Sequence, residues 1–178
     1  MKLFISLIFT TIIAYMWITK DPRSWRRRLT GGILKAYLII LLVVIPQIIS
    51  FIYFPIPNNI LDPVLVTIGT VSFILGFILL IWARITMGQL WGPPGQHDMS
   101  YQKKLITTGP FRYSRNPIYL GAFLLLFGFS LILRSIFFFL PIIHLIYFKK
   151  QVKKEEKILK KIFGKEYEKY CEKVKRFI

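Results

Sequence analysis

The residues best suited to chemistry begin in a long polar stretch between two apolar segments, from Gly88 to Asn116. A Gly-Pro-Pro-Gly run at 92–95 excludes a helix there, and a loop this long in a small protein is often functional. The stretch ends in Asn116-Pro117, which predicts a helix start because Asn caps helices and Pro suits the first helical position. The unpaired amides of such a turn favour an anion, and Arg112 and Arg115 flank it. The alternative is that both arginines reach lipid phosphates.

A carboxylate interrupts an apolar stripe in the C-terminal region. Val152 and Leu159, followed by Ile162 or Phe163, recur at helical spacing, and Glu155 falls three residues after Val152 and four before Leu159. An unpaired carboxylate turned toward a buried face is costly, so we expect a cationic partner or a ligand beside Glu155. An ordinary ion pair with a lysine on the same helix is the alternative.

Two more polar residues lie on the face that carries Glu155. Gln151 precedes Glu155 by four residues and His144 precedes it by eleven. His144 falls inside an apolar segment, and an ionisable group within a membrane is a candidate for function. A hydrogen-bonded histidine of the core fits the pattern equally well.

Several classes of site are not supported by the sequence. The lone Cys171 forms neither an intrachain disulfide nor a zinc cluster. There is no phosphate-binding glycine loop and no carboxylate-rich metal site, so we expect no metal. No nucleic-acid-binding motif accompanies the net charge of +17, so we expect no nucleic-acid partner. No catalytic residue can be named from these patterns.

Apolar helices must position these residues, because 54% of the chain is hydrophobic and its mean hydropathy is +0.54. A helix that crosses a ~30 Å hydrocarbon core needs about 20 residues. The second and third apolar stretches meet that length, and the first and fourth need flanking residues. The fifth either continues as a helix past Lys149 or forms a shallow hairpin with the fourth, joined by a tight turn at Arg134-Ser135. The stretches are Leu3–Ile18, Ala36–Phe54, Val64–Ala83, Pro117–Leu133 and Ile136–Phe148. No small-residue cleavage site follows the first, so we expect it to be retained as a membrane helix.

The basic residues predict the orientation of these helices. They gather after the first stretch, after the third and in the tail from Lys149 to Arg176, whereas residues 55–63 carry none. Basic loops stay cytoplasmic, which predicts five crossings with the N-terminus outside and the C-terminus in the cytoplasm. Anionic lipids are the expected partners of the basic tail, because such segments attract them by about 1 kcal/mol per residue.

Paired glycines predict close helix packing. Gly69 and Gly76 are seven residues apart on one face of the third stretch, and Gly121 and Gly128 repeat the spacing on the fourth. Small residues at this spacing let membrane helices approach closely. We therefore predict one all-α membrane domain over residues 1–178, in which residues 1–83 are scaffold and residues 84–178 carry the function.

The C-terminal half resembles the isoprenylcysteine carboxyl methyltransferase family. The resemblance rests on the run from Lys104 to Gly121, on Glu155–Leu159, on Phe163–Tyr170 and on Val174–Ile178, which occur in this order and spacing. It covers roughly residues 84–178. The resemblance implies a membrane enzyme that uses S-adenosylmethionine to methylate the carboxylate of a prenylated cysteine, a lipophilic substrate that enters from the bilayer.

The resemblance also implies a cofactor pocket that faces the cytosol. It places substrate binding at Gln151, and we count His144 as a second candidate for that role. Asn116 stands where better-known members have His, and Gln151 stands where they have Arg. Glutamine cannot form the bidentate charged clamp that an arginine offers a carboxylate, so amine and thiol acceptors stay open. The implied cofactor contacts are Gln96, Lys103, Lys104, Leu105, Ile106, Phe111, Asn116, Pro117, Ile118, Tyr119 and Glu155.

Three other functions compete with prenylcysteine methylation. Methylation of a phospholipid or of a small amine or thiol is the nearest, because of Gln151. A membrane reductase of the sterol type would share a related helical half but bind NADPH. A non-enzymatic membrane subunit would leave Glu155 without a role.

Overall fold

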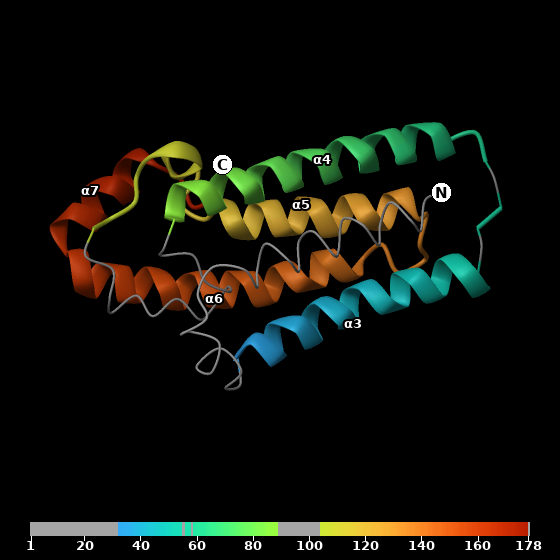
Figure 1. The fold of residues 1–178 in the computed structure, drawn as a ribbon, viewed down its shortest axis with the longest axis horizontal. Coiled ribbons are helices and arrows are strands. Elements are labelled where there is room, and N and C mark those ends of the chain that lie inside the picture. Colours follow the sequence, from blue (N-terminus) through green and yellow to red (C-terminus); the bar gives the residue numbers. More distant parts are fainter. Residues whose placement is uncertain (1–31, 55, 58, 89–103, 178) are drawn as a thin grey trace.

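The computed structural model describes residues 32–54, 56–57, 59–88 and 104–177, and every regular element in these ranges is a helix. The long helices run roughly along one axis, and the short α7 lies at one end (Figure 1). This confirms the all-α fold for the described residues, while the first apolar stretch, Leu3–Ile18, lies outside them. In chain order the elements are α3 (Gly32–Tyr53), α4 (Asp62–Met87), the 3-10 helix η3 (Gly109–Arg112), α5 (Pro117–Ile132), α6 (Leu140–Phe163) and α7 (Lys165–Lys173).

Helix α4 has the length and composition of a membrane-crossing helix. Its 26 residues span about 39 Å at the rise of an α-helix. Two further apolar helical segments, Leu41–Tyr53 and Pro117–Ile132, are shorter. Among the described residues one helix thus meets the requirement for a crossing. The five-crossing topology and its orientation stay predictions.

Helices α4 and α5 pack backbone against backbone through the four glycines. A Cβ atom on Gly76 would lie 2.7 Å from the carbonyl oxygen of Gly121 and 2.6 Å from the backbone nitrogen of Leu125. A Cβ atom on Gly128 would lie 2.5 Å from the carbonyl oxygen of Gly69. Because these atoms belong to the main chain, they cannot move aside. The predicted close packing of the two glycine pairs is confirmed.

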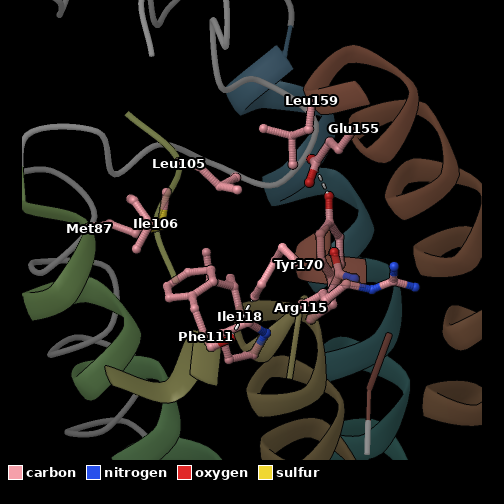
Figure 2. A pocket seen from close by; sticks show the side chains of 12 residues that line it. Met87, Leu105, Ile106, Phe111, Arg115, Ile118, Glu155, Leu159 and Tyr170 are labelled. Carbon is pink, nitrogen blue, oxygen red and sulfur yellow. Dashed lines mark hydrogen bonds between the residues drawn. The ribbon is translucent and has the colours of Figure 1, made fainter. Parts of the chain in front are cut away.

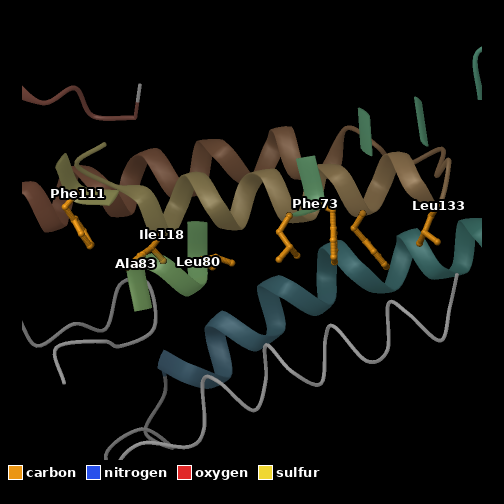
Figure 3. Packing of buried hydrophobic residues seen from close by; sticks show 8 residues of the cluster. Phe73, Leu80, Ala83, Phe111, Ile118 and Leu133 are labelled. Carbon is orange, nitrogen blue, oxygen red and sulfur yellow. The ribbon is translucent and has the colours of Figure 1, made fainter. Parts of the chain in front are cut away.

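The main hydrophobic core follows the interface between α4 and α5 (Figure 3). Phe73 and Leu80 of α4 face Leu125 and Phe129 of α5, and Phe111 of η3 extends the core toward the polar loop. Partly buried residues of α3, among them Ile48, pack against this core. The core therefore holds the loop before α5 and the two glycine-bearing helices in one unit.

Buried polar contacts attach α3. The side chain of Gln47 is fully buried and donates a hydrogen bond to the hydroxyl of Ser130 in α5 at 2.6 Å. The backbone N–H of Ile136 donates to the hydroxyl of Ser50 at 3.0 Å. Hydrogen bonds between helices compensate polar groups that apolar surroundings would otherwise leave unsatisfied. They fix α3 beside the connection between α5 and α6.

That connection is longer than predicted. Helix α5 ends at Ile132 and α6 begins at Leu140, so the predicted tight turn at Arg134-Ser135 and a fifth segment from Ile136 are wrong in their bounds. Arg134 adopts a positive φ of 50° and pairs with Asp62 at the start of α4, and its guanidinium also donates to the Ile56 carbonyl at 2.6 Å. These tertiary contacts connect the turn to the start of α4 and to the segment before it.

Helix α6 continues without a break from the apolar segment into the basic tail. Of the two alternatives for the fifth segment, the helix that runs past Lys149 is confirmed, and it ends only at Gly164 with a φ of 49°. Helix α7 follows and buries Tyr167 and Tyr170 with Val174 against Leu105. The tail thereby folds back onto the loop that precedes α5.

Candidate functional site

A pocket lies where the end of α4, the loop before α5, the start of α5 and the tail helices meet (Figure 2). Its volume is about 60 Å³, and most of its lining is aliphatic or aromatic. Glu155, Arg115 and Asn116 are the residues with charged or amide side chains in the lining. The lining residues are Met87, Leu105, Ile106, Phe111, Arg115, Asn116, Pro117, Ile118, Tyr119, Glu155, Leu159 and Tyr170.

The sequence builds one wall of the pocket at the predicted helix start. Pro117 is the first residue of α5, and Asn116 occupies the N-cap position with a φ of −132°. The side-chain oxygen of Asn116 accepts no capping hydrogen bond, and its side-chain NH2 group donates to the carbonyl of Arg176 at 3.1 Å. The helix start is therefore confirmed, and Asn116 serves as a link to the C-terminal segment rather than as a cap.

The carboxylate of Glu155 and the hydroxyl of Tyr119 meet at the pocket. The hydroxyl donates a hydrogen bond to Glu155 Oε1 at 2.5 Å, and both residues are buried. In Figure 2 the dashed line at the carboxylate of Glu155 marks this hydrogen bond. Val152 is fully buried and Leu159 lines the pocket, so the apolar stripe around Glu155 is confirmed.

The neighbouring carboxylate points elsewhere. Glu156 accepts two hydrogen bonds from Arg176 Nε at 3.1 Å and one from its Nη2 at 2.7 Å. Arg115 Nη2 lies 3.4 Å from the same carboxylate. The hydrogen bond with Glu156 raises the pKa of Arg176. Consecutive glutamates thus have separate environments: Glu155 faces the pocket and Glu156 joins α6 to two arginines.

The residues after α7 close the wall behind the pocket. The backbone N–H of Arg115 donates to the Lys175 carbonyl at 3.0 Å. Phe177 packs against the cluster of Tyr119, Phe148 and Val152. The ring of Tyr119 also meets that of Phe148 edge to face at 5.1 Å. The C-terminal segment therefore supports the tyrosine that holds Glu155.

Tyr170 is a pocket residue that the sequence patterns did not single out. Its hydroxyl donates to the carbonyl of Phe111 at 2.6 Å. Burial raises the pKa of Tyr170 well above its ordinary value, so the hydroxyl stays protonated and able to donate. The spacing of Tyr167 and Tyr170 on the amphipathic helix α7 is the pattern that could have found it. Met87 and Leu159 had not been predicted as lining residues either.

Most of the predicted cofactor contacts come together in this pocket. The sequence places them in two regions about 40 residues apart, and the fold joins the regions. Lys104 is exposed and does not line the pocket, and Gln96 and Lys103 lie outside the described residues. Those that line it are Leu105, Ile106, Phe111, Asn116, Pro117, Ile118, Tyr119 and Glu155.

The two predicted substrate residues lie on α6 before Glu155. His144 is buried and stacks edge to face on Phe148 at 4.3 Å between ring centres. Gln151 is half-buried, one turn before Glu155. Neither residue lines the described pocket. Both lie beside the face of α6 that includes Glu155, and their role stays a prediction.

Comparison with known proteins shows the family to which the chain is similar. A sequence model described as phospholipid methyltransferase matches residues 64–166, more than half of the 178 residues. Two curated relatives, from Oryza sativa subsp. indica and Oryza sativa subsp. japonica, are both named probable protein-S-isoprenylcysteine O-methyltransferase. Each is 32% identical over 111 residues, which cover 60% of this chain and 57% of the relative.

The matched part thus spans little more than half of the curated relatives. No solved structure matches the chain. The family match runs from the start of α4 to the start of α7 and includes Glu155, Tyr119 and the loop between α4 and α5. On this match, the chain belongs to the phospholipid methyltransferase family.

Proposed function

We propose that this chain is a membrane methyltransferase that uses S-adenosylmethionine and transfers its methyl group to a lipophilic acceptor. The observation that carries the proposal is the buried contact between Tyr119 and Glu155 in a mainly apolar pocket within the family match. A buried carboxylate is costly in a helix that serves only as scaffold, whereas a cationic ligand would compensate its charge.

The chemistry of the lining fits S-adenosylmethionine. Glu155 suits the ammonium group of the cofactor, and the start of α5 at Asn116-Pro117 suits its carboxylate. Phe111 and Tyr119 offer aromatic faces for the adenine or, through cation–π attraction, for the sulfonium.

The chain's own contribution is placement. When bound, the cofactor supplies an activated methyl group. The Tyr119 hydroxyl fixes the Glu155 carboxylate, and the Glu156–Arg176 ion pair holds α6 against the segment that supports Tyr119. Transfer to a methyl carbon depends on the alignment of the acceptor more than on acid–base catalysis. This agrees with a site whose prominent feature is one positioned carboxylate.

We propose that the acceptor is a prenylcysteine-like carboxylate. The names of the two rice relatives, both probable protein-S-isoprenylcysteine O-methyltransferases, support this substrate class. The exposed apolar residues of α4 and of the first half of α6, such as Ile78 and Ile146, favour a route from the bilayer. Gln151 lies on α6 between that apolar half and Glu155, and His144 lies within the apolar half on the side of the helix that carries Glu155. Both are placed where an acceptor from the bilayer would pass.

A phospholipid amine is the second candidate. The family description names phospholipid methylation. Gln151 favours this acceptor as well, because a neutral side chain does not repel an amine that becomes positive during transfer.

Two measurements test the proposal. Titration calorimetry of the purified protein should give binding of S-adenosylmethionine and S-adenosylhomocysteine and none of NADPH. Labelled cofactor should then transfer its methyl group to a prenylcysteine analogue in preference to phosphatidylethanolamine or a small thiol. Transfer to phosphatidylethanolamine alone would replace the first acceptor with the second. Binding of NADPH without S-adenosylmethionine would overturn the proposal and favour a reductase.

A further inference from the structure

The second half of α6 carries lysines on one face only. At about 100° per residue, Lys149, Lys150, Lys153, Lys154, Lys157 and Lys161 fall within an arc of about 140°. All six are exposed. The buried residues Phe148, Val152 and Glu155 lie on the opposite side of the helix. We call these six residues the lysine ridge.

The positive charge of the ridge is not neutralised within α6. The two acidic residues of this helix are occupied elsewhere, because Glu155 faces the pocket and Glu156 pairs with Arg115 and Arg176. Lys160 falls within the same arc, but it pairs with Glu168 of α7 at 2.8 Å, and we leave it out of the ridge for that reason. The ridge therefore presents a row of like charges, which repel one another unless an anionic surface compensates them.

Exposed isoleucines precede the ridge on the same face of α6, and they indicate where the anionic surface lies. Ile142, Ile143 and Ile146 project on the side that later carries the lysines, and they are 46%, 54% and 59% exposed. The face changes from isoleucine to lysine within one turn, between Ile146 and Lys149. Such a change on a continuous helix matches the boundary between hydrocarbon and headgroups.

We infer that the lysine ridge binds the anionic headgroups of the bilayer that contains the apolar half of α6. Lys149 to Lys154 lie within about 8 Å of the boundary along the helix axis, inside the Debye length of ~8–10 Å. Lys161 lies about 18 Å from the boundary, where salt screens the attraction. The first four lysines should therefore account for most of the binding.

In this arrangement the two faces of α6 have different roles. The face with Glu155 contributes to the pocket, and the face with the ridge holds the helix at an anionic membrane surface. The inference rests on the proposed membrane location of the chain but not on the identity of the acceptor or the cofactor. Its test therefore uses lipid binding and needs no methyl transfer.

The test compares two variants of the full chain with equal loss of charge. In the first, Lys149, Lys150, Lys153 and Lys154 are changed to Gln. In the matched control, the exposed lysines 165, 169, 173 and 175, which lie after α6, are changed to Gln. Each protein is reconstituted with phosphatidylcholine and phosphatidylglycerol, and spin-labelled lipids measure the preference of its lipid shell for phosphatidylglycerol.

The wild type and the control should prefer phosphatidylglycerol, with a preference that weakens as salt rises. The preference of the ridge variant for phosphatidylglycerol should be at least about fivefold weaker than that of the wild type. This is the effect of losing a single charge near the surface. A third variant with Arg at the four ridge positions should restore it, which separates charge from folding. Equal loss in the ridge variant and the control, or no preference in the wild type, would overturn the inference. Binding of an acidic protein without any lipid preference would do the same.

Discussion

The hydroxyl of Tyr119 donates a 2.5 Å hydrogen bond to the carboxylate of Glu155 and so joins the first turn of α5 to the middle of α6. The two residues are 36 positions apart in the chain, and the pocket forms around their contact. Hydrogen bonds to a charged group are stronger than those between neutral groups. The contact fixes the direction of the carboxylate in a pocket whose lining is otherwise mainly apolar.

Changing Glu155 to Gln should weaken binding of S-adenosylmethionine far more than changing Glu156 to Gln. Glu155 faces the pocket, whereas Glu156 pairs with Arg176 on the other side. The loss of a charge-assisted hydrogen bond costs ~1.5–3 kcal/mol, or roughly tenfold to a hundredfold in affinity. The Glu156 variant should instead lose up to about 1 kcal/mol of stability. Calorimetric titration measures the affinities, and equal effects of both changes would remove Glu155 from the binding site.

Changing Gly76 to Ala should destabilise the protein by about 1–3 kcal/mol, the usual cost of overpacking. The new Cβ atom would lie 2.6 Å from the backbone nitrogen of Leu125, so the helices must separate. Thr70 on the exposed side of α4 gives the control, because its change to Ala touches no other helix. Thermal unfolding in detergent should show a lower midpoint for the glycine variant alone. Unchanged stability would contradict the close approach of α4 and α5.

Changing Phe177 to Ala should lower both stability and cofactor affinity. The ring packs against the cluster that supports Tyr119, so its removal leaves a gap behind the pocket. We expect a loss of about 2 kcal/mol, less than for a fully buried ring. Lys175 is exposed, and its change to Ala is the control. If the Phe177 variant bound the cofactor with wild-type affinity, the C-terminal segment would not position the site.

The predicted topology has its own test. A cysteine placed at Asn59, in a chain whose Cys171 is changed to Ser, should react with an impermeant thiol reagent from outside intact cells. A cysteine at the exposed position of Lys165 should react only after the membrane is opened. The contrast follows from the prediction that the basic residues of the tail keep it in the cytoplasm. The reverse pattern of labelling would invert the orientation.

Changing Gln151 to Arg distinguishes the two acceptor classes. If the acceptor is a carboxylate, the guanidinium should preserve or improve its binding by forming a bidentate pair. If the acceptor is an amine, the added positive charge should reduce transfer. Gln151→Met is the neutral control for side-chain volume. Methyl incorporation into a prenylcysteine analogue and into phosphatidylethanolamine, measured for all three proteins, decides between them.

The local features of the site could be predicted from the sequence. Asn116-Pro117 marks a helix start, and the spacing of Val152, Glu155 and Leu159 places a carboxylate in an apolar stripe. Both patterns depend on neighbours within two helical turns. The close packing of α4 and α5 could also be predicted from their glycine pairs, because such packing requires small residues at a fixed interval.

The contacts between distant segments could not be predicted in the same way. The Asn116 side chain was expected to cap its own helix, but the structure shows its NH2 group donating to the Arg176 carbonyl. Every residue has a backbone carbonyl, so the sequence does not indicate which one accepts. The turn between α5 and α6 was expected to be tight. It runs from Leu133 to Phe139, and Arg134 within it pairs with Asp62, 72 residues away.

The glycine contacts between α4 and α5 also determine how the pocket can open. Main-chain atoms meet there directly, so no side chain can change rotamer to let the two helices slide apart. These helices should move as one rigid body on the microsecond-to-millisecond timescale of collective motions. Helix α6 is joined to that body at the pocket through the Tyr119–Glu155 hydrogen bond and the Glu156–Arg115 ion pair, both of which can break and re-form. Entry and exit of ligands should therefore proceed by displacement of α6 relative to this body.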